Sequence, residues 1–244
     1  LSSEPRRSNL KLLDTMTRQI EPDSPETKRT TSSGSKRKKV RPGRIRERNR
    51  ERILMAAEKE FSQNGFGATT VQKIADRAGL PKSNVLYYFS NKKRIYYALM
   101  DDIMGRWKEM FSKIQPEDDP ATTLASFIHA KVELSRTHPL ASRLFALEII
   151  QGAPVLKDHL STTMREWVQA RAGVIQQWID AGRMAPVDPV QLILLIWSST
   201  QHYADFQVQI LAIEDKSEYT ESDFQHAADF LTSVILRGCG LAEP

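Results

Sequence analysis

Four polar side chains lie close together between residues 82 and 87 of the chain. They are Lys82, Ser83, Asn84 and Tyr87. If this segment is helical, Tyr87 follows Ser83 by one turn, and the four groups can share an outward face. Ammonium, hydroxyl and amide groups hydrogen-bond phosphate oxygens and the edges of bases. The set therefore predicts a surface that contacts nucleic acid.

Two short helices, predicted at about residues 70–78 and 82–88, would have to position these side chains. Thr69 and Gln72 have the spacing of a capping box that opens the first helix. Gly79 suits the turn between the helices, because glycine adopts positive φ at little cost. The residues predicted to face the core are Ile74, Ala75, Ala78, Leu80, Val85 and Phe89. Packing positions at these spacings indicate a helix-turn-helix.

Further residues around this motif are predicted to contact DNA. Thr69 and Thr70 lie at the start of the first short helix, and Lys92 lies where another helix N-terminus could meet phosphate. Tyr88 is assigned to the same surface, although core packing explains at least part of its presence. Tyr87 is the better candidate of the two tyrosines, because it falls on the outward face.

Basic residues are concentrated in the first part of the chain. Residues 28–52 hold twelve Lys and Arg against two acidic residues, whereas residues 101–244 have a net charge of −8. Neutralising phosphates requires Lys and Arg, so this asymmetry suits an N-terminal region that meets a polyanion. An anionic membrane surface would attract the same charge, and a merely solvated basic tail is the third interpretation.

The hydrophobic pattern is helical nearly everywhere from residue 44 onward and predicts an all-α fold. Residues 1–43 are rich in Ser, Thr, Pro and charge and are predicted to be a disordered basic tail. Residues 44–90 would form the helix-turn-helix domain and residues 91–244 a second helical domain. The longer helices are predicted at about 44–64, 91–113, 120–137, 139–151, 155–182, 188–213 and 221–237.

Several classes of protein are excluded by motifs that the chain lacks. The apolar run Leu192–Trp197 is far shorter than a membrane span, and no signal peptide opens the sequence, so we expect a cytoplasmic protein with no membrane partner. Cys239 is the single cysteine, which rules out an intrachain disulfide. No catalytic motif is found, and the histidines lack ligand spacing, so we expect no enzyme, metal or cofactor. These histidines are His129, His138, His159, His202 and His226.

The segment T-T-V-Q-K-I-A-D-R-A-G-L-P-K-S-N-V-L-Y-Y-F-S-N-K, residues 69–92, resembles the tetracycline-repressor (TetR) family of bacterial regulators. The resemblance covers about residues 44–100. It implies an all-α homodimer that reads palindromic double-stranded DNA through a three-helix N-terminal domain. The C-terminal domain would then bind a small effector and dimerise. Pro81 departs from the family pattern, since many relatives have serine there, and this removes a side-chain cap or phosphate contact.

The C-terminal domain resembles a narrower group, the uracil-responsive repressors of pyrimidine utilisation. The matching segments, within about residues 125–210, are K-V-E-L-S-R, A-S-R-L-F, G-A-P-V-L and W-S-S-T-Q-H-Y-A-D-F. The resemblance implies a repressor of genes for nucleobase or nitrogen catabolism, with uracil or a related pyrimidine as its effector. The effector pocket that it implies is lined by Trp107, Trp197 and Gln201, with Phe145, Thr200 and Tyr203 as neighbours.

The residues themselves agree in part with that implication. Trp197 and Gln201 are one helical turn apart and could present an aromatic face and an amide to a flat polar heterocycle. Alternatively, the tryptophans are core anchors and Gln201 satisfies a buried polar contact. The apolar stripes of residues 188–213 and 221–237 would likewise form either the dimer interface, which we favour, or intrachain core.

Two other functions stay open on the sequence alone. The first is a regulator of the same family that responds to an apolar inducer instead of a pyrimidine. The second is a helical protein whose basic arm binds a membrane surface or an acidic partner, with residues 69–88 serving only for packing.

Overall fold

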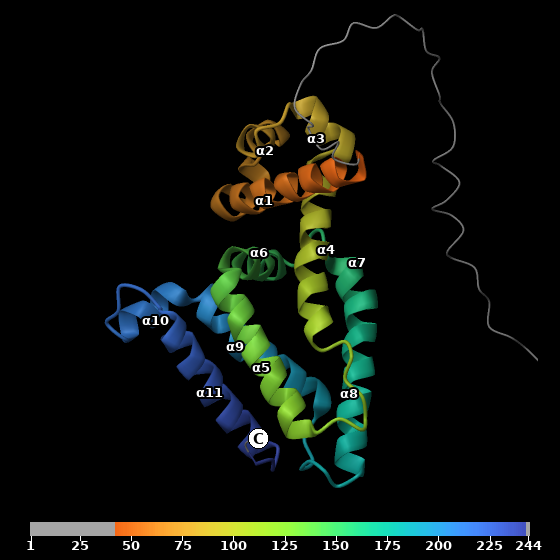
Figure 1. Cartoon of the computed structure of the whole chain (residues 1–244), viewed down its shortest axis with the longest axis vertical. Coiled ribbons are helices and arrows are strands. Elements are labelled where there is room, and N and C mark those ends of the chain that lie inside the picture. Colours follow the sequence, from red (N-terminus) through yellow and green to blue (C-terminus); the bar gives the residue numbers. More distant parts are fainter. Residues whose placement is uncertain (1–41, 243–244) are drawn as a thin grey trace, which may run out of the picture. The chain divides into compact units, whose positions relative to one another are not determined.

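The computed structural model describes residues 42–242, whose regular structure consists of helices (Figure 1). No strand occurs within this range, so the predicted all-α fold is confirmed. All but two residues of the predicted tail, residues 1–43, lie outside the described range. No helix between residues 42 and 242 is long and apolar enough to span a bilayer.

The first three helices are α1 (Pro42–Ala68), α2 (Val71–Ala78) and α3 (Lys82–Tyr88). Gly65 interrupts α1 with φ 69° and ψ 171°, a conformation open almost only to glycine. Helical structure then resumes as far as Ala68. The positive φ at Gly65 agrees with the prediction that a helix ends here, but the additional turn after it was not foreseen.

The remaining helices begin with α4 (Lys92–Met110), α5 (Pro120–Thr137) and α6 (Pro139–Ile150). They continue with α7 (Lys157–His159), the π-helix η1 (Leu160–Met164) and α8 (Arg165–Asp180). The last three are α9 (Pro189–Asp205), α10 (Gln207–Ile213) and α11 (Glu221–Gly238).

Two of the predicted long helices are divided. The segment predicted as one helix over residues 155–182 contains the π-helical turn η1, and the segment over residues 188–213 breaks at Phe206. Neither division coincides with a glycine or proline, so the sequence offers no local signal for it. By contrast, α5 and α9 begin within one residue of their predicted starts, and in each an aspartate caps the helix just before a proline.

Two large hydrophobic clusters hold the helices together. The first joins Ile53 and Phe61 of α1 to Leu144 of α6 and Met164 of η1. The second lies among α5, α8, α9 and α11. Trp197 is partly buried and packs against both clusters. Helix α4 contributes Ile95 to Met104 to the first cluster and leads into Phe111 of the second.

The apolar residues of α9 and α11 lie on two faces of these helices. One face fits the interpretation as intrachain core, and the other fits the interpretation as a dimer interface. Ile193, Ile196 and Leu236 are fully buried and form intrachain core. Leu195 and Phe230 face away from it and are 52% and 57% exposed. One face of these helices therefore packs within the chain, and the other is an exposed apolar surface.

Candidate nucleic-acid interface and effector pocket

The first helix of the helix-turn-helix, α2, is capped at both ends. Thr70, not Thr69, caps α2: its hydroxyl accepts a hydrogen bond of 3.2 Å from the backbone N–H of Lys73. The predicted capping box of Thr69 and Gln72 is therefore wrong by one residue. Gly79 ends α2 in the left-handed region at φ 62°, and the next residue, Leu80, donates its N–H to the α2 backbone.

Thr69 lies inside the domain and not on its surface. Its side chain is fully buried, and Oγ1 lies 2.8 Å from the carbonyl oxygen of Gly65 and 3.1 Å from that of Glu60. The hydroxyl thus ties the kink of α1 to the start of α2. In this structure its side chain cannot reach DNA, and Thr70 is the exposed member of the pair.

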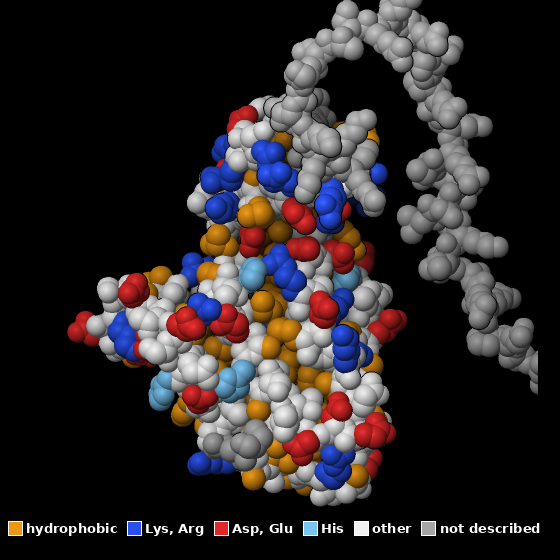
Figure 2. All heavy atoms as spheres, in the orientation of Figure 1, with side chains coloured by type: hydrophobic (Ala, Val, Ile, Leu, Met, Phe, Trp, Pro, Cys, Tyr) orange, Lys and Arg blue, Asp and Glu red, His pale blue; other side chains and the backbone are white. Residues whose placement is uncertain are grey.

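Helix α3 presents most of the predicted DNA-contacting set to solvent. Lys82, Ser83 and Tyr87 are exposed, with Tyr87 at 74%, and Asn84 is half-buried. Pro81 precedes the helix, and within residues 42–242 no side chain caps its N-terminus. Lys and Arg side chains are also exposed on the visible face of α1 to α3 (Figure 2).

Tyr88 belongs partly to the core, as the alternative interpretation allowed. It is half-buried, packs against the first hydrophobic cluster, and its hydroxyl lies 3.4 Å from Nδ2 of Asn49. Tyr87 and Tyr88 therefore have different environments although they are neighbours in sequence.

Lys92 is half-buried, and its ammonium is held by the backbone instead of pointing freely to solvent. Its ammonium donates to the carbonyl oxygens of Phe66 at 2.7 Å, Gly67 at 3.1 Å and Thr69 at 2.9 Å. It also lies 4.5 Å above the ring of Phe66. An ammonium has three donors, and all three are occupied. Lys92 thus clamps the start of α4 to the end of α1, and its predicted contact with phosphate would require breaking this clamp.

Two arginines brace α1 against α2. Arg77 pairs with the buried carboxylate of Glu60 at 2.6 Å, and Arg52 donates to the carbonyl oxygen of Ala78 at 2.6 Å. Sequence analysis missed both contacts, because they join residues 17 and 26 positions apart. Part of the basic charge of the N-terminal region therefore fixes the motif instead of facing a ligand.

The second candidate site is a small cavity at the junction of the two hydrophobic clusters. Its volume is about 20 Å³. Six helices supply its walls: α4, α5, α6, η1, α8 and α9. The lining residues are Trp107, Lys108, Lys131, Phe145, Met164, Trp167, Trp197 and Gln201.

Four of the six predicted effector residues meet in this cavity, namely Trp107, Phe145, Trp197 and Gln201. Thr200 is fully buried elsewhere and donates to the carbonyl oxygen of Ile196 at 2.6 Å. Neighbouring residues on a helix point about 100° apart, which directs Thr200 away from the cavity that Gln201 lines. Tyr203 packs in a separate small cluster.

Aromatic rings form most of the cavity wall. The indoles of Trp167 and Trp197 are stacked, with centroids 5.9 Å apart and planes inclined by 28°. Trp107 and Phe145 meet edge to face at 4.8 Å. Between residues 42 and 242, Nε1 of Trp167 is a buried donor that has no hydrogen-bond partner.

Lys131 is the charged residue most deeply buried in this wall. It is only 2% exposed, and its ammonium donates to Oε1 of Gln201 at 3.2 Å and lies 4.5 Å over the ring of Trp107. Burial lowers the pKa of Lys131 to about 7, and the negative charge of Asp205 partly opposes this shift. Sequence analysis missed this residue. A signal was present, since Lys131 lies three and four positions after the buried Ile128 and Phe127.

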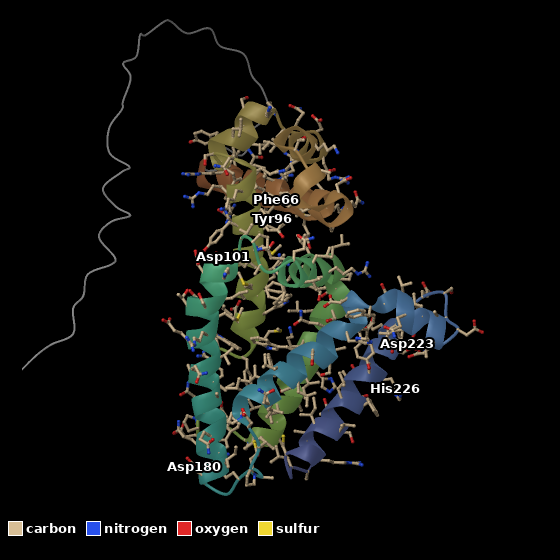
Figure 3. All side chains as sticks on the ribbon, turned by 180° about the vertical axis from the view of Figure 1, so that it is seen from behind. Phe66, Tyr96, Asp101, Asp180, Asp223 and His226 are labelled. Atoms are coloured by element: carbon tan, nitrogen blue, oxygen red, sulfur yellow. The ribbon has the colours of Figure 1, made fainter. Side chains whose placement is uncertain are left out.

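The buried carboxylate of Glu148 on α6 connects this helix to α4 and to the segment that follows α6. Oε1 of Glu148 accepts from the backbone N–H groups of Val155 at 2.7 Å and Leu156 at 3.1 Å, and Oε2 accepts from the hydroxyl of Tyr96 at 2.9 Å. Burial, followed by the nearby carboxylate, raises the pKa of Tyr96 and keeps its hydroxyl protonated. The Tyr96 ring packs edge-on against Phe66. Figure 3 labels these two residues next to each other.

Two family models match consecutive parts of the chain. Residues 53–99 match the model described as bacterial regulatory proteins of the tetR family, and residues 100–242 match the C-terminal region of YcdC-like proteins. This chain belongs to the TetR family. It is therefore a TetR-type transcriptional regulator, and its relatives are regulators and not enzymes, as the lack of catalytic motifs predicts.

Curated TetR-family relatives support this assignment over most of the sequence. The HTH-type transcriptional regulator RutR of Escherichia coli (strain K12) is 37% identical over 186 residues, which cover 76% of this chain and 88% of RutR. The HTH-type transcriptional repressor NicS of Pseudomonas putida is 26% identical and aligns with 56% of this chain and 64% of NicS.

Solved structures share the TetR-family fold. A tetR-family regulatory protein from Rhodococcus RHA1 superposes with a TM-score of 0.64 at 21% identity, covering 80% of this chain and 98% of that protein. The transcriptional regulator SCO4942 from Streptomyces coelicolor gives a TM-score of 0.63 at 19% identity, with coverages of 80% and 99%. At these identities the likeness concerns the fold alone.

Proposed function

We propose that this TetR-family regulator is a repressor that binds a palindromic operator as a homodimer and is released by a flat polar effector, a pyrimidine such as uracil. The observation that carries the proposal is the convergence of Trp107, Trp197 and Gln201 on one buried cavity. Aromatic faces and an amide suit a planar heterocycle that has both donors and acceptors. The resemblance to the uracil-responsive group supports the same ligand class.

The exposed face of α3 is the part of the dimer that would enter the major groove. Ser83 and Asn84 can hydrogen-bond base edges, whereas Lys82, Tyr87 and Thr70 can hold phosphates. Two such helices in a dimer read half-sites about one helical turn of DNA apart. We assign no phosphate contact to Lys92, because its donors are occupied by backbone carbonyls.

The homodimer would form through the outward face of α9 and α11. Leu195, Phe230 and Val234 are each more than half exposed there, and a groove of about 500 Å³ follows the same helices. Single exposed apolar residues are ordinary, but a contiguous patch marks an interaction surface. Leu195→Glu should shift the protein from dimer to monomer in sedimentation equilibrium and weaken operator binding. Ile150→Glu, at an exposed apolar residue on α6, is the matched control and should leave the dimer intact.

Effector binding in this cavity requires the walls to move. A volume of about 20 Å³ accommodates roughly one water molecule, far less than a pyrimidine ring. One wall residue is Trp107 on α4, the helix that follows directly after the helix-turn-helix. An effector that opens the cavity thereby favours a different position of α4, and with it a different spacing of the two DNA-binding domains.

The test is operator binding measured by fluorescence anisotropy with and without uracil. Saturating uracil should lower operator affinity in the wild-type protein, and unchanged affinity would contradict the proposed switch. Gln201→Leu should weaken the response to uracil by roughly tenfold or more, because the ligand loses its amide partner. Tyr203→Phe, outside the cavity, is the control. A response to long-chain apolar compounds that Gln201→Leu leaves intact would favour the alternative of an apolar inducer.

A further inference from the structure

The unmatched polar groups of the effector cavity are hydrogen-bond donors. Lys131 carries three N–H groups, and the described part of the chain gives it one acceptor, Oε1 of Gln201 at 3.2 Å. The indole N–H of Trp167 has none between residues 42 and 242. A ligand that satisfies these groups must therefore bring acceptors, and anionic acceptors make the strongest hydrogen bonds with an ammonium.

The charged groups around Lys131 also favour a ligand with anionic acceptors. Asp205 of α9 acts on it electrostatically, but no ion pair joins the two in residues 42–242. Burial raises the pKa of Asp205, and the positive charges of Lys131, Arg143 on α6 and His202 on α9 oppose this. Lys108 on α4 lines the cavity too and lies 3.1 Å from Nε2 of His159. Asp101 also acts electrostatically on Lys108. The cations Lys131, Lys108 and Arg143 thus face two carboxylates, Asp101 and Asp205.

A buried ammonium that has one hydrogen-bond acceptor and no ion pair is unfavourable, because burial removes its hydration. Burial correspondingly lowers the pKa of Lys131. A bound anion would supply the ion pair that residues 42–242 do not give Lys131. The cavity is therefore complementary to a negatively charged ring more than to a neutral one.

We propose that the cavity selects its effector by acidity, binding the ring imide of a pyrimidine as its anion, held by the ammonium of Lys131 and the indole N–H of Trp167. This inference rests on the proposed function, in which a pyrimidine occupies the cavity. The proton is conserved in this step. The imide N–H bond breaks, and its proton bonds to Nζ when the Lys131 amine is neutral or leaves to solvent when the ammonium already exists.

The experiment compares three ring imides of nearly equal size and increasing acidity, namely the pyrimidines uracil and 5-fluorouracil and the triazine analogue 6-azauracil. Three tryptophans line the cavity, so quenching of intrinsic fluorescence reports binding directly. At pH 7 the affinity of the wild-type protein should rise along the series by about tenfold, the equivalent of one pKa unit of differential interaction. Lys131→Met should reduce this gradient to within about twofold. Lys113→Met is the matched control, since it removes an exposed lysine outside the cavity, and should keep the gradient.

A second measurement does not depend on any variant folding correctly. The ¹⁹F chemical shift of 5-fluorouracil bound to the wild-type protein should correspond to the imide anion, as calibrated by titrating the free compound. A neutral bound ligand, a flat affinity series, or an unchanged gradient in Lys131→Met would overturn the inference while leaving pyrimidine binding intact. If none of the three compounds binds the wild-type protein, the proposed function itself is wrong.

Discussion

The helix-turn-helix and the effector cavity differ in how completely the chain satisfies their buried polar groups. In the helix-turn-helix, the hydroxyl of Thr69, the carboxylate of Glu60 and the ammonium of Lys92 all have close partners. Around the cavity, Nε1 of the lining residue Trp167 has no partner among residues 42–242.

This difference indicates what each region needs in order to work. Nearly all buried polar groups in native proteins are hydrogen-bonded, so an exception calls for a specific explanation. The DNA-reading unit is held in one geometry by its own contacts, which preorganises its exposed face. The cavity is left incomplete by the chain, as expected of a site that a ligand completes.

The largest expected effect comes from removing the hydrogen bonds of Lys92, in the helix-turn-helix region where the buried polar groups named above all have partners. Lys92→Met removes three hydrogen bonds from an ammonium to backbone carbonyls and should lower the free energy of unfolding by about 3 kcal/mol. Thermal or urea denaturation measures this loss. Lys93→Met is the control, because Lys93 is exposed, and should leave stability within about 0.5 kcal/mol. If Lys92→Met kept full stability but reduced the salt dependence of DNA binding, Lys92 would be a phosphate ligand after all.

The effector cavity can be tested at Lys131 through the pH dependence of the free energy of unfolding. The pKa of Lys131 is lowered from 10.5 to about 7 in the folded protein, so between these values the unfolded chain binds more protons than the folded one. The free energy of unfolding should therefore rise with pH above pH 7, by about 1 kcal/mol per pH unit. Urea denaturation between pH 7 and pH 9 should show this slope in the wild-type protein and lose it in Lys131→Met. An identical slope in the two proteins would show that Lys131 is charged in the folded state throughout.

A smaller effect is expected where the two regions connect. Tyr96→Phe keeps the ring against Phe66 but removes the hydroxyl that donates to Glu148. Operator affinity and effector affinity, each measured alone, should change little, whereas the effect of one ligand on the other should fall by about 1 kcal/mol. Effector titrations with and without operator measure this coupling. Coupling equal to that of the wild-type protein would show that the hydroxyl does not transmit the signal.

The smallest predicted change concerns the exposed face of α3. Tyr87→Phe removes one hydroxyl that we place against a phosphate and should weaken operator binding by about 0.5–1 kcal/mol without altering stability. Tyr88→Phe, in which the hydroxyl faces Asn49, is the paired control for anisotropy measurements. Equal losses of operator affinity in both variants would contradict the assignment of Tyr87 to DNA contact and of Tyr88 to the core.

Local patterns in the sequence predicted the helix-turn-helix well, since its positions lie within twenty residues. The capping residue was misplaced by one position, because Thr69 and Thr70 are identical in type and only the backbone distinguishes them. The role of Lys92 could not be read from spacing, since its partners precede it by 23 to 26 residues. Trp167 and Lys131 were missed because the cavity draws on six helices that sequence alone does not bring together.

The small volume of the cavity also has a kinetic consequence. If only a small fraction of molecules is open at any moment, the apparent dissociation constant is the intrinsic constant divided by that fraction. The association rate is reduced in the same proportion when opening precedes binding. The effector concentration at which the regulator responds is then set jointly by the contacts in the cavity and by the free energy of opening it. Core substitutions remote from both DNA and effector could therefore shift the response threshold without touching either ligand.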